Sequence, residues 1–563
     1  MANLTRRSIL LGSVATLALV GFGVGDVSRS RDRALALSLS RALMPRGTTL
    51  ESASAPLGSG AYRRLGTGAG VPLVVRTELC PAIAGRDDRR EGVGVFAQLT
   101  DLHIVDAQSP MRFESFVDVD KAAFRPQEAL GTHGAAQLIR RIDDLDGGPF
   151  TGRPLDCAVT TGDNTDNGES IELQWFLALM NGGELTANTG HARDWEGVQN
   201  ADDPRFYRPS IDDRDVYKTA GFPVIERMLS AAIQPHTSPG LTMPWYTVFG
   251  NHDDSIGGTV PLSWSALESA YTGSVKFTGF ADDRGNKAVR DAFSSRTALP
   301  PDAASALDRH WTVTADDRRA PFTPTQFMAA HLLADAVGPG PAGHGFTPEA
   351  LAQHRSWYSF PISDDVLGIA LDSTNAAGFT HGSLGEAQFR WLETELVKAS
   401  DRYVVVFSHH PSGSMDNLRP DPRSPHETRH TGAEVLSLLG RHPNVVAWVN
   451  GHTHANRITA HTGSTPRHAF WEITTASHID FPQQARVIEV CRNGDGTLSI
   501  FTTLVESAAP HRAPYDDGSQ SALASLYREL AFNDLGSASG GAARRAGSNT
   551  DRNTELLLKD PLA

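Results

Sequence analysis

The chain has 563 residues, of which 40% are hydrophobic and 21% are charged, a composition typical of a soluble globular protein. Its formal net charge of -14 argues against specific nucleic-acid binding. An anionic small-molecule substrate is not excluded, because bound metal ions can reverse the sign of the local field. The three cysteines, Cys80, Cys157 and Cys491, are too few for a disulfide framework or a thiolate metal site.

The N-terminus carries a targeting pattern. Arg6 and Arg7 precede a short apolar run that ends near Val24, which resembles a bacterial twin-arginine export leader. The run is shorter than the roughly 20 residues of a membrane-spanning helix. We predict a leader over residues 1–36 and a periplasmic, cell-surface or secreted protein. Only an uncleaved leader would attach it to a membrane. Residues 37–92, rich in glycine, serine and arginine, are predicted to be irregular.

Five apolar segments of strand length are each followed directly by side chains that can bind a metal. Residues 96–100 precede Asp101 and His103, residues 155–160 precede Asp163, residues 245–249 precede Asn251, residues 403–408 precede His409, and residues 445–449 precede His452 and His454. In open α/β sheets, sites form beyond the carboxyl ends of the strands. One such block is weak evidence, but five together predict a metal site within a single catalytic domain over residues 93–507.

The intervals between these blocks are longer than bare crossovers require. We predict insertions at about residues 183–240 and 255–355, which either cap the site or cover a sheet edge. Thr323 and Thr347, each followed by proline, predict helix starts, and Ser383 and Glu386 predict a capping box. Arg112 is expected to face solvent in preference to a phosphate.

The chain after the last block continues with a strand over residues 470–477 and a polar loop. His478 lies in this loop and is expected at the surface, in preference to the substrate. Residues 487–490 and 498–504 predict a hairpin that closes the domain. Residues 508–563 are predicted to form a partly disordered tail, helical only over residues 521–530.

The ordered set D-x-H, G-D, G-N-H-D, H and G-H-x-H resembles the calcineurin-like metallophosphoesterases, which include the purple acid phosphatases. The resemblance implies an α/β fold of two packed mixed β-sheets flanked by helices, a four-layer sandwich, here with large insertions. It implies two divalent or trivalent metal ions, Fe, Mn or Zn. One ion would be held by Asp101, His103, Asp163 and His454, and the other by Asp163, Asn251, His409 and His452.

The same resemblance implies the reaction. A hydroxide that bridges the two ions would hydrolyse a phosphate monoester or diester of a small molecule. His252 would face the substrate as its acid, and Asp253 would orient the imidazole. His410, next to His409, is the alternative ligand at that position. Two other functions stay open: a nucleotidase or pyrophosphatase-like hydrolase, and a non-catalytic, metal-stabilised surface binding protein.

Overall fold

The computed structural model describes residues 45–563 except 119, 261–267, 281–282, 296–308 and 537–540. The predicted leader, residues 1–36, lies outside the described residues. Among the helices of the described part, none combines the length and apolar character that crossing a bilayer requires.

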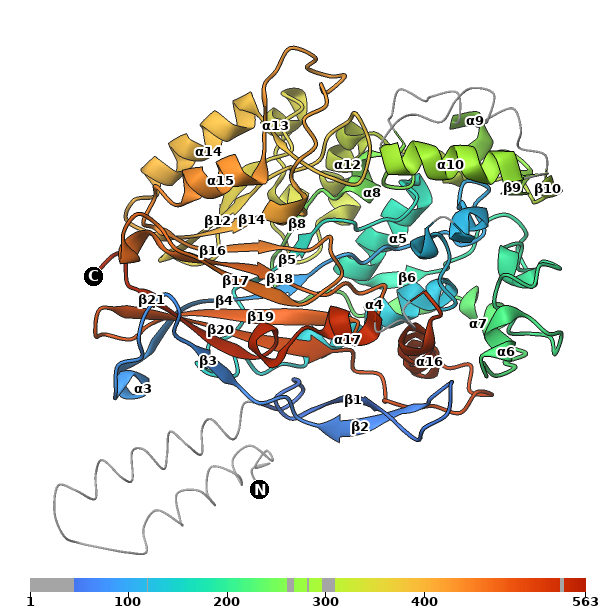
Figure 1. The fold of residues 1–563 in the computed structure, drawn as a ribbon, viewed down its shortest axis with the longest axis horizontal. Helices are drawn as coiled ribbons and strands as arrows, with labels where there is room; N and C mark the ends of the chain where they lie inside the picture. The colour runs from blue at the N-terminus through green and yellow to red at the C-terminus, as the bar shows by residue number, and fades with distance from the viewer. Residues whose placement is uncertain (1–44, 119, 261–267, 281–282, 296–308, 537–540) are drawn as a thin grey trace, which may run out of the picture. The chain divides into compact units, whose positions relative to one another are not determined.

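Two large mixed sheets form the centre of the fold (Figure 1). The first has the order β3-β21-β20-β19-β4-β5-β8 and the second the order β11-β12-β14-β16-β18-β17. The strands of the first sheet are β3 (Val74–Arg76), β4 (Glu91–Leu99), β5 (Cys157–Thr161), β8 (Trp245–Val248), β19 (Gln484–Arg492), β20 (Thr497–Glu506) and β21 (Thr554–Lys559). Those of the second are β11 (Tyr358–Pro361), β12 (Val366–Ala370), β14 (Tyr403–Phe407), β16 (Val445–Asn450), β17 (Arg457–His461) and β18 (Phe470–Thr474).

The two sheets pack face to face over one large apolar core. The ring of Phe96 on β4 lies 5.4 Å from that of Phe407 on β14, and both belong to the same buried cluster. Neighbouring β4, β5 and β8 are parallel in the first sheet, and β12, β14, β16 and β18 are parallel in the second. The carboxyl ends of each parallel set therefore lie at one edge of its sheet.

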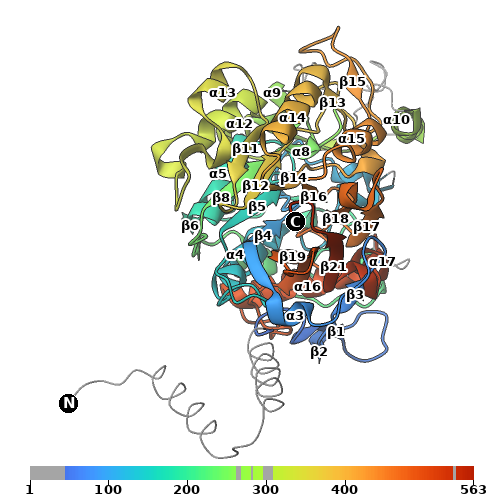
Figure 2. The same cartoon turned by 90° about the vertical axis from the view of Figure 1, so that its left-hand side faces the viewer.

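Helices cover the outer faces of both sheets (Figures 1 and 2). Leu392 and Leu396 of α14 (Glu386–Lys398) and Val435 of α15 (Gly432–Leu439) pack on the second sheet in a separate buried cluster. The first sheet is covered by α4 (Gly131–Asp143) and α5 (Ser170–Asn181), and α16 (Gln520–Asn533) packs on α4, where Tyr527 lies against Gly134. This arrangement confirms the predicted fold class of two packed mixed sheets flanked by helices.

The two segments that the sequence predicts as insertions carry regular structure of their own. The first contains β6 (Gly183–Leu185), α6 (Val216–Thr219), α7 (Met228–Ala232) and β7 (His236–Ser238). The second contains α9 (Glu268–Tyr271), β9 (Val275–Gly279), α10 (Asp283–Ser295), β10 (Arg309–Thr312), α12 (Pro324–His331) and α13 (Pro348–Ala352). The Thr323 and Thr347 side chains cap α12 and α13, as the sequence predicts. The predicted capping box at α14 is wrong, because the Ser383 hydroxyl donates to the Asn417 carbonyl instead.

Both ends of the described chain hold more regular structure than the sequence suggests. The prediction of a tail over residues 508–563 is wrong for β21, which lies between β20 and β3 with Leu556, Leu557 and Leu558 buried. Likewise, residues 37–92 are not wholly irregular, since β1 (Ser52–Pro56) and β2 (Leu65–Ala69) form a hairpin and β3 joins the first sheet. The chain also contains three short helices, α3 (Arg86–Arg89), α8 (Asn251–Asp254) and α17 (Gly541–Ala546).

Candidate metal centre

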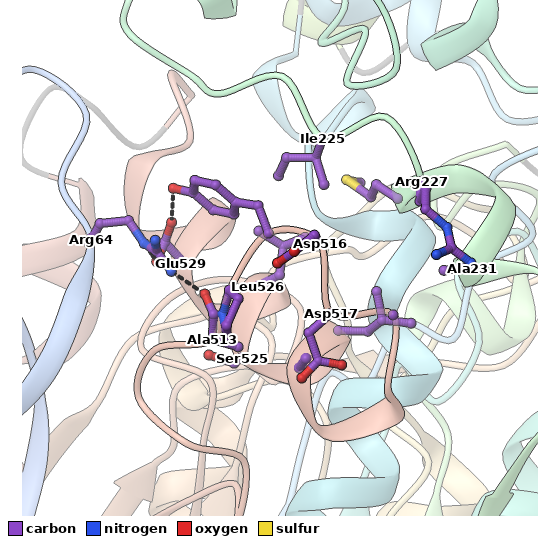
Figure 3. Close-up of a pocket in the computed structure, with 16 residues that line it drawn as sticks. Arg64, Ile225, Arg227, Ala231, Ala513, Asp516, Asp517, Ser525, Leu526 and Glu529 are labelled. Atoms are coloured by element: carbon purple, nitrogen blue, oxygen red, sulfur yellow. Dashed lines mark hydrogen bonds and ion pairs between the residues drawn. The ribbon is translucent and has the colours of Figure 1, made fainter.

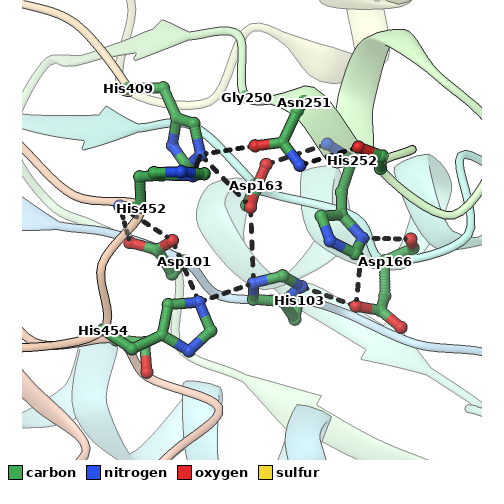
Figure 4. Close-up of polar contacts among 12 residues, drawn as sticks. Asp101, His103, Asp163, Asp166, Gly250, Asn251, His252, His409, His452 and His454 are labelled. Atoms are coloured by element: carbon green, nitrogen blue, oxygen red, sulfur yellow. Dashed lines mark hydrogen bonds and ion pairs between the residues drawn. The ribbon is translucent and has the colours of Figure 1, made fainter. Parts of the chain in front are cut away.

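The loops after five parallel strands converge at one place (Figure 4). Asp101 and His103 follow β4, Asp163 follows β5, and Asn251 opens α8 after β8. From the second sheet, His409 follows β14, and His452 and His454 follow β16. The structure therefore brings together all seven residues that the sequence nominates as metal ligands.

The backbone at this place is strained. Asp101, His103, Asp163, His452 and His454 have positive φ angles of 49°, 43°, 50°, 67° and 53°. A residue with a Cβ atom pays on the order of 1–3 kcal/mol for such a conformation, which persists only where the surroundings impose it. Strain collected in this way is typical of functional sites.

Four side chains form a first group of donor atoms. The Nε2 atoms of His103 and His454 lie 3.2 Å apart. Nε2 of His103 is 3.5 Å from Oδ2 of Asp163, and Nε2 of His454 is 3.3 Å from Oδ1 of Asp101. These carboxylates and rings thus surround a common point.

The hydrogen bonds behind the rings fix where their protons lie. Nδ1 of His103 is 2.5 Å from Oδ1 of Asp166, and Nδ1 of His454 is 2.6 Å from Oδ2 of Asp480. Because a carboxylate only accepts, each neutral ring carries its proton on Nδ1. The two facing Nε2 atoms then present lone pairs to each other, an arrangement that requires a cation or an added proton between them.

A second group shares Asp163 with the first. Nε2 of His409 lies 3.2 Å from Oδ2 of Asp163, 3.0 Å from Oδ1 of Asn251 and 3.2 Å from Nδ1 of His452. Nδ1 of His409 donates to the Thr161 carbonyl at 2.9 Å. Nδ2 of Asn251 donates to the Gly258 carbonyl at 3.0 Å. The atoms turned inward, Nε2 of His409 and Oδ1 of Asn251, are therefore both acceptors.

The donor spacing fits metal ions. Metal–ligand bonds of about 2.1 Å place two ligands of one ion about 3.0 Å apart at an octahedral angle and about 3.4 Å apart at a tetrahedral one. The separations within both groups, from 3.0 to 3.5 Å, match these values. Imidazole, carboxylate and amide donors without thiolate suit ions such as Zn²⁺, Mn²⁺ or Fe. The geometry indicates a two-metal site.

The electrostatics agree with a site that attracts positive charge. Burial alone would lower the pKa of His409, but the nearby Asp163 carboxylate outweighs it and raises the pKa to about 9. Asp101 does the same for His454, whose pKa also rises to about 9. In contrast, burial and the neighbouring His252 lower the pKa of His103 to about 4. Without metal, protons on His409 and His454 compensate the buried carboxylates.

Two carboxylates that were not predicted from the sequence hold the rings of candidate ligands in place. Asp166 lies behind His103 and also pairs with Arg112, while Asp480 lies behind His454 and accepts from Arg125 at 2.9 Å. Arg112 is buried in these contacts, so the prediction that it faces solvent is wrong. Both aspartates lie in loops that follow core strands. This position in the sequence could have predicted that they belong to the site.

His252 and its neighbour Asp253 differ in role. Nδ1 of His252 donates to the Asp166 carbonyl oxygen at 2.6 Å, and its side chain keeps 20% of its surface exposed. Asp253 is buried and accepts from the backbone N–H groups of Asn164, Thr165 and Gly250. The prediction that Asp253 orients His252 is therefore wrong, since Asp166 holds the ring and Asp253 braces the loops.

The neighbouring histidines are also placed. Both ring nitrogens of His410 are engaged, Nδ1 with the Ser373 hydroxyl at 2.8 Å and Nε2 with the Thr380 carbonyl at 3.0 Å. His409, and not His410, therefore turns its ring toward Asn251 and Asp163. His478 is buried with its backbone N–H against the Thr100 carbonyl, so the expected surface position is wrong.

A separate cavity lies between α7, α16 and the loop at residues 513–518 (Figure 3). Its charged lining includes Asp516, Asp517 and Glu529. Glu529 accepts from Tyr62, Tyr515 and Arg64. Among the described residues that line it, none is one of the seven residues of the candidate metal centre.

Known phosphodiesterases share sequence with part of the chain. The chain is 29% identical over 106 residues to glycerophosphodiester phosphodiesterase GpdQ of Enterobacter lignolyticus, a match covering 19% of this chain and 37% of the relative. It is 34% identical over 107 residues to a probable GpdQ of Arcobacter nitrofigilis, covering 18% and 37%. It is 28% identical over 170 residues to the 3',5'-cyclic adenosine monophosphate phosphodiesterase CpdA of Escherichia coli, covering 28% and 51%.

These matches span between 37% and 51% of the relatives' own lengths. They support the resemblance to the calcineurin-like metallophosphoesterases. A solved dimetal phosphatase from Danio rerio aligns with a TM-score of 0.34 and 11% identity, covering 74% of this chain and 100% of that one. No protein-family model matches the chain.

Proposed function

We propose that this chain is a calcineurin-like metallophosphoesterase that hydrolyses a small-molecule phosphate ester with two metal ions. The observation that carries the proposal is the set of inward-facing lone pairs: Nε2 of His103 opposite Nε2 of His454, and Nε2 of His409 opposite Oδ1 of Asn251. The phosphodiesterase names of the relatives make a phosphodiester the first substrate class to test.

Asp163 would be shared by the two metal ions. Asp163 offers Oδ2 to both groups, and its negative charge would offset the repulsion between two cations. When bound, two such ions polarise the phosphoryl oxygen, lower the pKa of a bound water and stabilise an in-line transition state.

His252 is the candidate acid. Because its Nδ1 donates to the Asp166 carbonyl, Nε2 is the nitrogen left to gain or lose a proton. The side chain is partly exposed, so a leaving oxygen can reach it. His252 would protonate the leaving alkoxide from Nε2.

The direct test measures metal content and turnover together. Elemental analysis of the native protein should find two metal ions per chain. A panel of p-nitrophenyl phosphate, bis-p-nitrophenyl phosphate and nucleotides should show hydrolysis, with the diester fastest. Preference for nucleotides would favour the nucleotidase alternative. Two bound metals with no turnover of any ester would favour the non-catalytic binding protein.

Substitutions distinguish the candidate metal ligands from the candidate general acid. We expect Asn251→Ala and His452→Ala to lose the second metal and activity. His252→Gln should keep both metals and lose about 10²- to 10⁴-fold in kcat, the usual contribution of general acid catalysis. Unchanged metal occupancy in Asn251→Ala and His452→Ala would refute the ligand assignment.

We also propose that the protein is exported by the twin-arginine route. Arg6 and Arg7 before the short apolar run support this proposal. In a host with this export route, Arg6→Lys/Arg7→Lys should leave the protein in the cytoplasm, and wild type should appear outside it. Export of the double variant at the wild-type level would contradict the proposal.

A further inference from the structure

The loop after β8 closes on itself next to the candidate centre. It begins with α8 and returns through a pair of backbone hydrogen bonds between Ile256 and Val260, of 3.2 and 2.9 Å. Two glycines, Gly257 and Gly258, form the turn, with φ angles of 57° and 69°. Both adopt a backbone conformation that penalises any side chain.

The surroundings of these two glycines differ. A Cβ atom on Gly258 would lie 2.4 Å from Cδ2 and 2.5 Å from Nε2 of His252, and 2.8 Å from Nδ2 of Asn251. A Cβ atom on Gly257 would meet nothing within 4 Å. A substitution at either position would therefore meet similar backbone strain, but only at Gly258 would the new side chain contact the site.

The carbonyl of Gly258 also decides how the Asn251 amide is turned. It accepts a hydrogen bond from Nδ2 of Asn251 at 3.0 Å, and this bond leaves Oδ1 facing Nε2 of His409. An amide has one end that donates and one that accepts. If the amide flipped, N–H groups would face the inward lone pairs and a cation would lose one ligand.

We propose that Gly258 is a positioning residue for the second metal ion. Its carbonyl holds the Asn251 amide with the oxygen inward, and its missing side chain leaves room for the Asn251 amide and the His252 ring. The inference rests on the two-metal centre of the proposed function. Gly258 lies outside the sequence motifs, and by this inference the affinity of the second ion depends on it.

The test compares Gly258→Ala with Gly257→Ala in the full chain. Metal-free proteins are titrated with Zn²⁺ alone and bound metal is counted by elemental analysis, with Co²⁺ absorbance as a second readout of the ligand set. We expect Gly258→Ala to bind the first ion like wild type and the second about tenfold or more weakly. Gly257→Ala should bind both ions like wild type.

Thermal unfolding of the metal-free proteins is the control for backbone strain. Both variants should lose stability, because both put a Cβ at positive φ. Wild-type binding of both ions by Gly258→Ala would overturn the inference. Equal weakening in the two variants would also overturn it, because strain alone would then explain the loss.

A second background keeps the test valid if Gly258→Ala does not fold. His252→Ala removes two of the three close contacts, so His252→Ala/Gly258→Ala is compared with His252→Ala alone. Weaker second-ion binding in the double variant supports the inference, and equal binding overturns it. If wild type binds two ions but cleaves no ester, and Gly258→Ala loses one ion, the proposed function fails and the role of Gly258 stands. A wild type that binds only one ion overturns both.

Discussion

The orientation of single rings decides whether this site can hold cations. His103 and His454 are each held by a carboxylate, Asp166 and Asp480, on the side away from the centre. Such partners fix the tautomer and raise the basicity of the ligating nitrogen. The two carboxylates touch none of the inward-facing atoms, yet they determine which nitrogen of each ring is free to bind.

Asp480→Asn should weaken the binding of the first metal ion by about 10- to 100-fold. The amide removes the charge that His454, Arg125 and Arg545 share, and it can place an N–H against Nδ1 of His454. Zn²⁺ titration with elemental counting measures the loss. Glu472→Gln is the control, because Glu472 is also buried and bonds to His461 and Ser412. Wild-type affinity in Asp480→Asn would contradict the assigned support.

Substitutions at the adjacent His409 and His410 test which of the two histidines binds the second metal ion. His409→Gln should lose the second ion, since its Nε2 faces Asp163 and Asn251. His410→Gln should keep both ions, because the ring of His410 is bonded to Ser373 and Thr380. Metal counting on both variants decides the matter. The opposite pattern would mean that the two histidines had been assigned in the wrong order.

At the scale of elements, β14 shows why the core strands are predictable. Val404 and Val406 face α14 and α15, whereas Val405 and Phe407 face the other sheet. A strand buried on both faces is a continuous apolar run, which stands out in the sequence. The run does not say which sheet the strand joins. One crevice was expected for all five blocks, and their ligands do meet, but the strands come from two sheets.

Other elements could not be predicted for physical reasons. β21 is a six-residue strand after a glycine- and alanine-rich stretch, and its partners β20 and β3 are distant in sequence, so no local pattern marks it. Asp253 follows His252 in sequence, but successive side chains of a helix point in different directions. Asp166, three residues after Asp163, supplies the contact instead. Adjacency in sequence was the wrong guide to adjacency in space.

A buried ion pair fastens the hairpin β9–β10, which lies in the second predicted insertion. Nζ of Lys276 lies 3.0 Å from Oε2 of Glu114, and both side chains are fully buried. Nζ also donates to the Ser109 carbonyl, in the loop that follows Asp101 and His103. Lys276→Met should cost about 3–5 kcal/mol of unfolding free energy, because it leaves a buried carboxyl without its partner.

Denaturant unfolding measures this cost. Lys276→Met/Glu114→Leu should recover most of it, because an apolar pair replaces the ionic one. The control is Lys287→Ala on α10, whose 2.5 Å pair with Asp291 is exposed and should contribute less than about 1 kcal/mol. Equal losses for Lys276→Met and Lys287→Ala would show that the buried pair does not fasten the hairpin.

At the scale of the whole molecule, the candidate centre joins segments from most of the chain. Asp101 comes from the first sheet and His454 from the second, and their side chains meet at 3.3 Å. Arg545 of α17, near the C-terminus, reaches Asp480 at 3.2 Å. The fold must therefore close around both sheets before the ligands are in place, so metal binding and folding should be coupled.

The stability of the whole fold should also depend on pH through Glu489 on β19. This carboxyl is fully buried and accepts from the backbone N–H of Phe150 and from the N–H and hydroxyl of Thr151. Burial outweighs these bonds and raises its pKa from 4.5 to about 7. The folded state thus binds the proton more tightly than the unfolded state. The resulting stabilisation is complete below about pH 4.5 and is lost as pH rises through about 7.

We therefore expect the free energy of unfolding to fall between pH 5 and pH 8, with Glu489 contributing about 2–3 kcal/mol of that decrease. Glu489→Gln keeps an acceptor for Thr151 but cannot titrate, so its profile should be flatter by this amount. Denaturant unfolding of the metal-free proteins at several pH values measures both profiles without interference from metal binding. If the two profiles run parallel, Glu489 does not hold its proton in the folded state, and burial is not the dominant influence on this carboxyl.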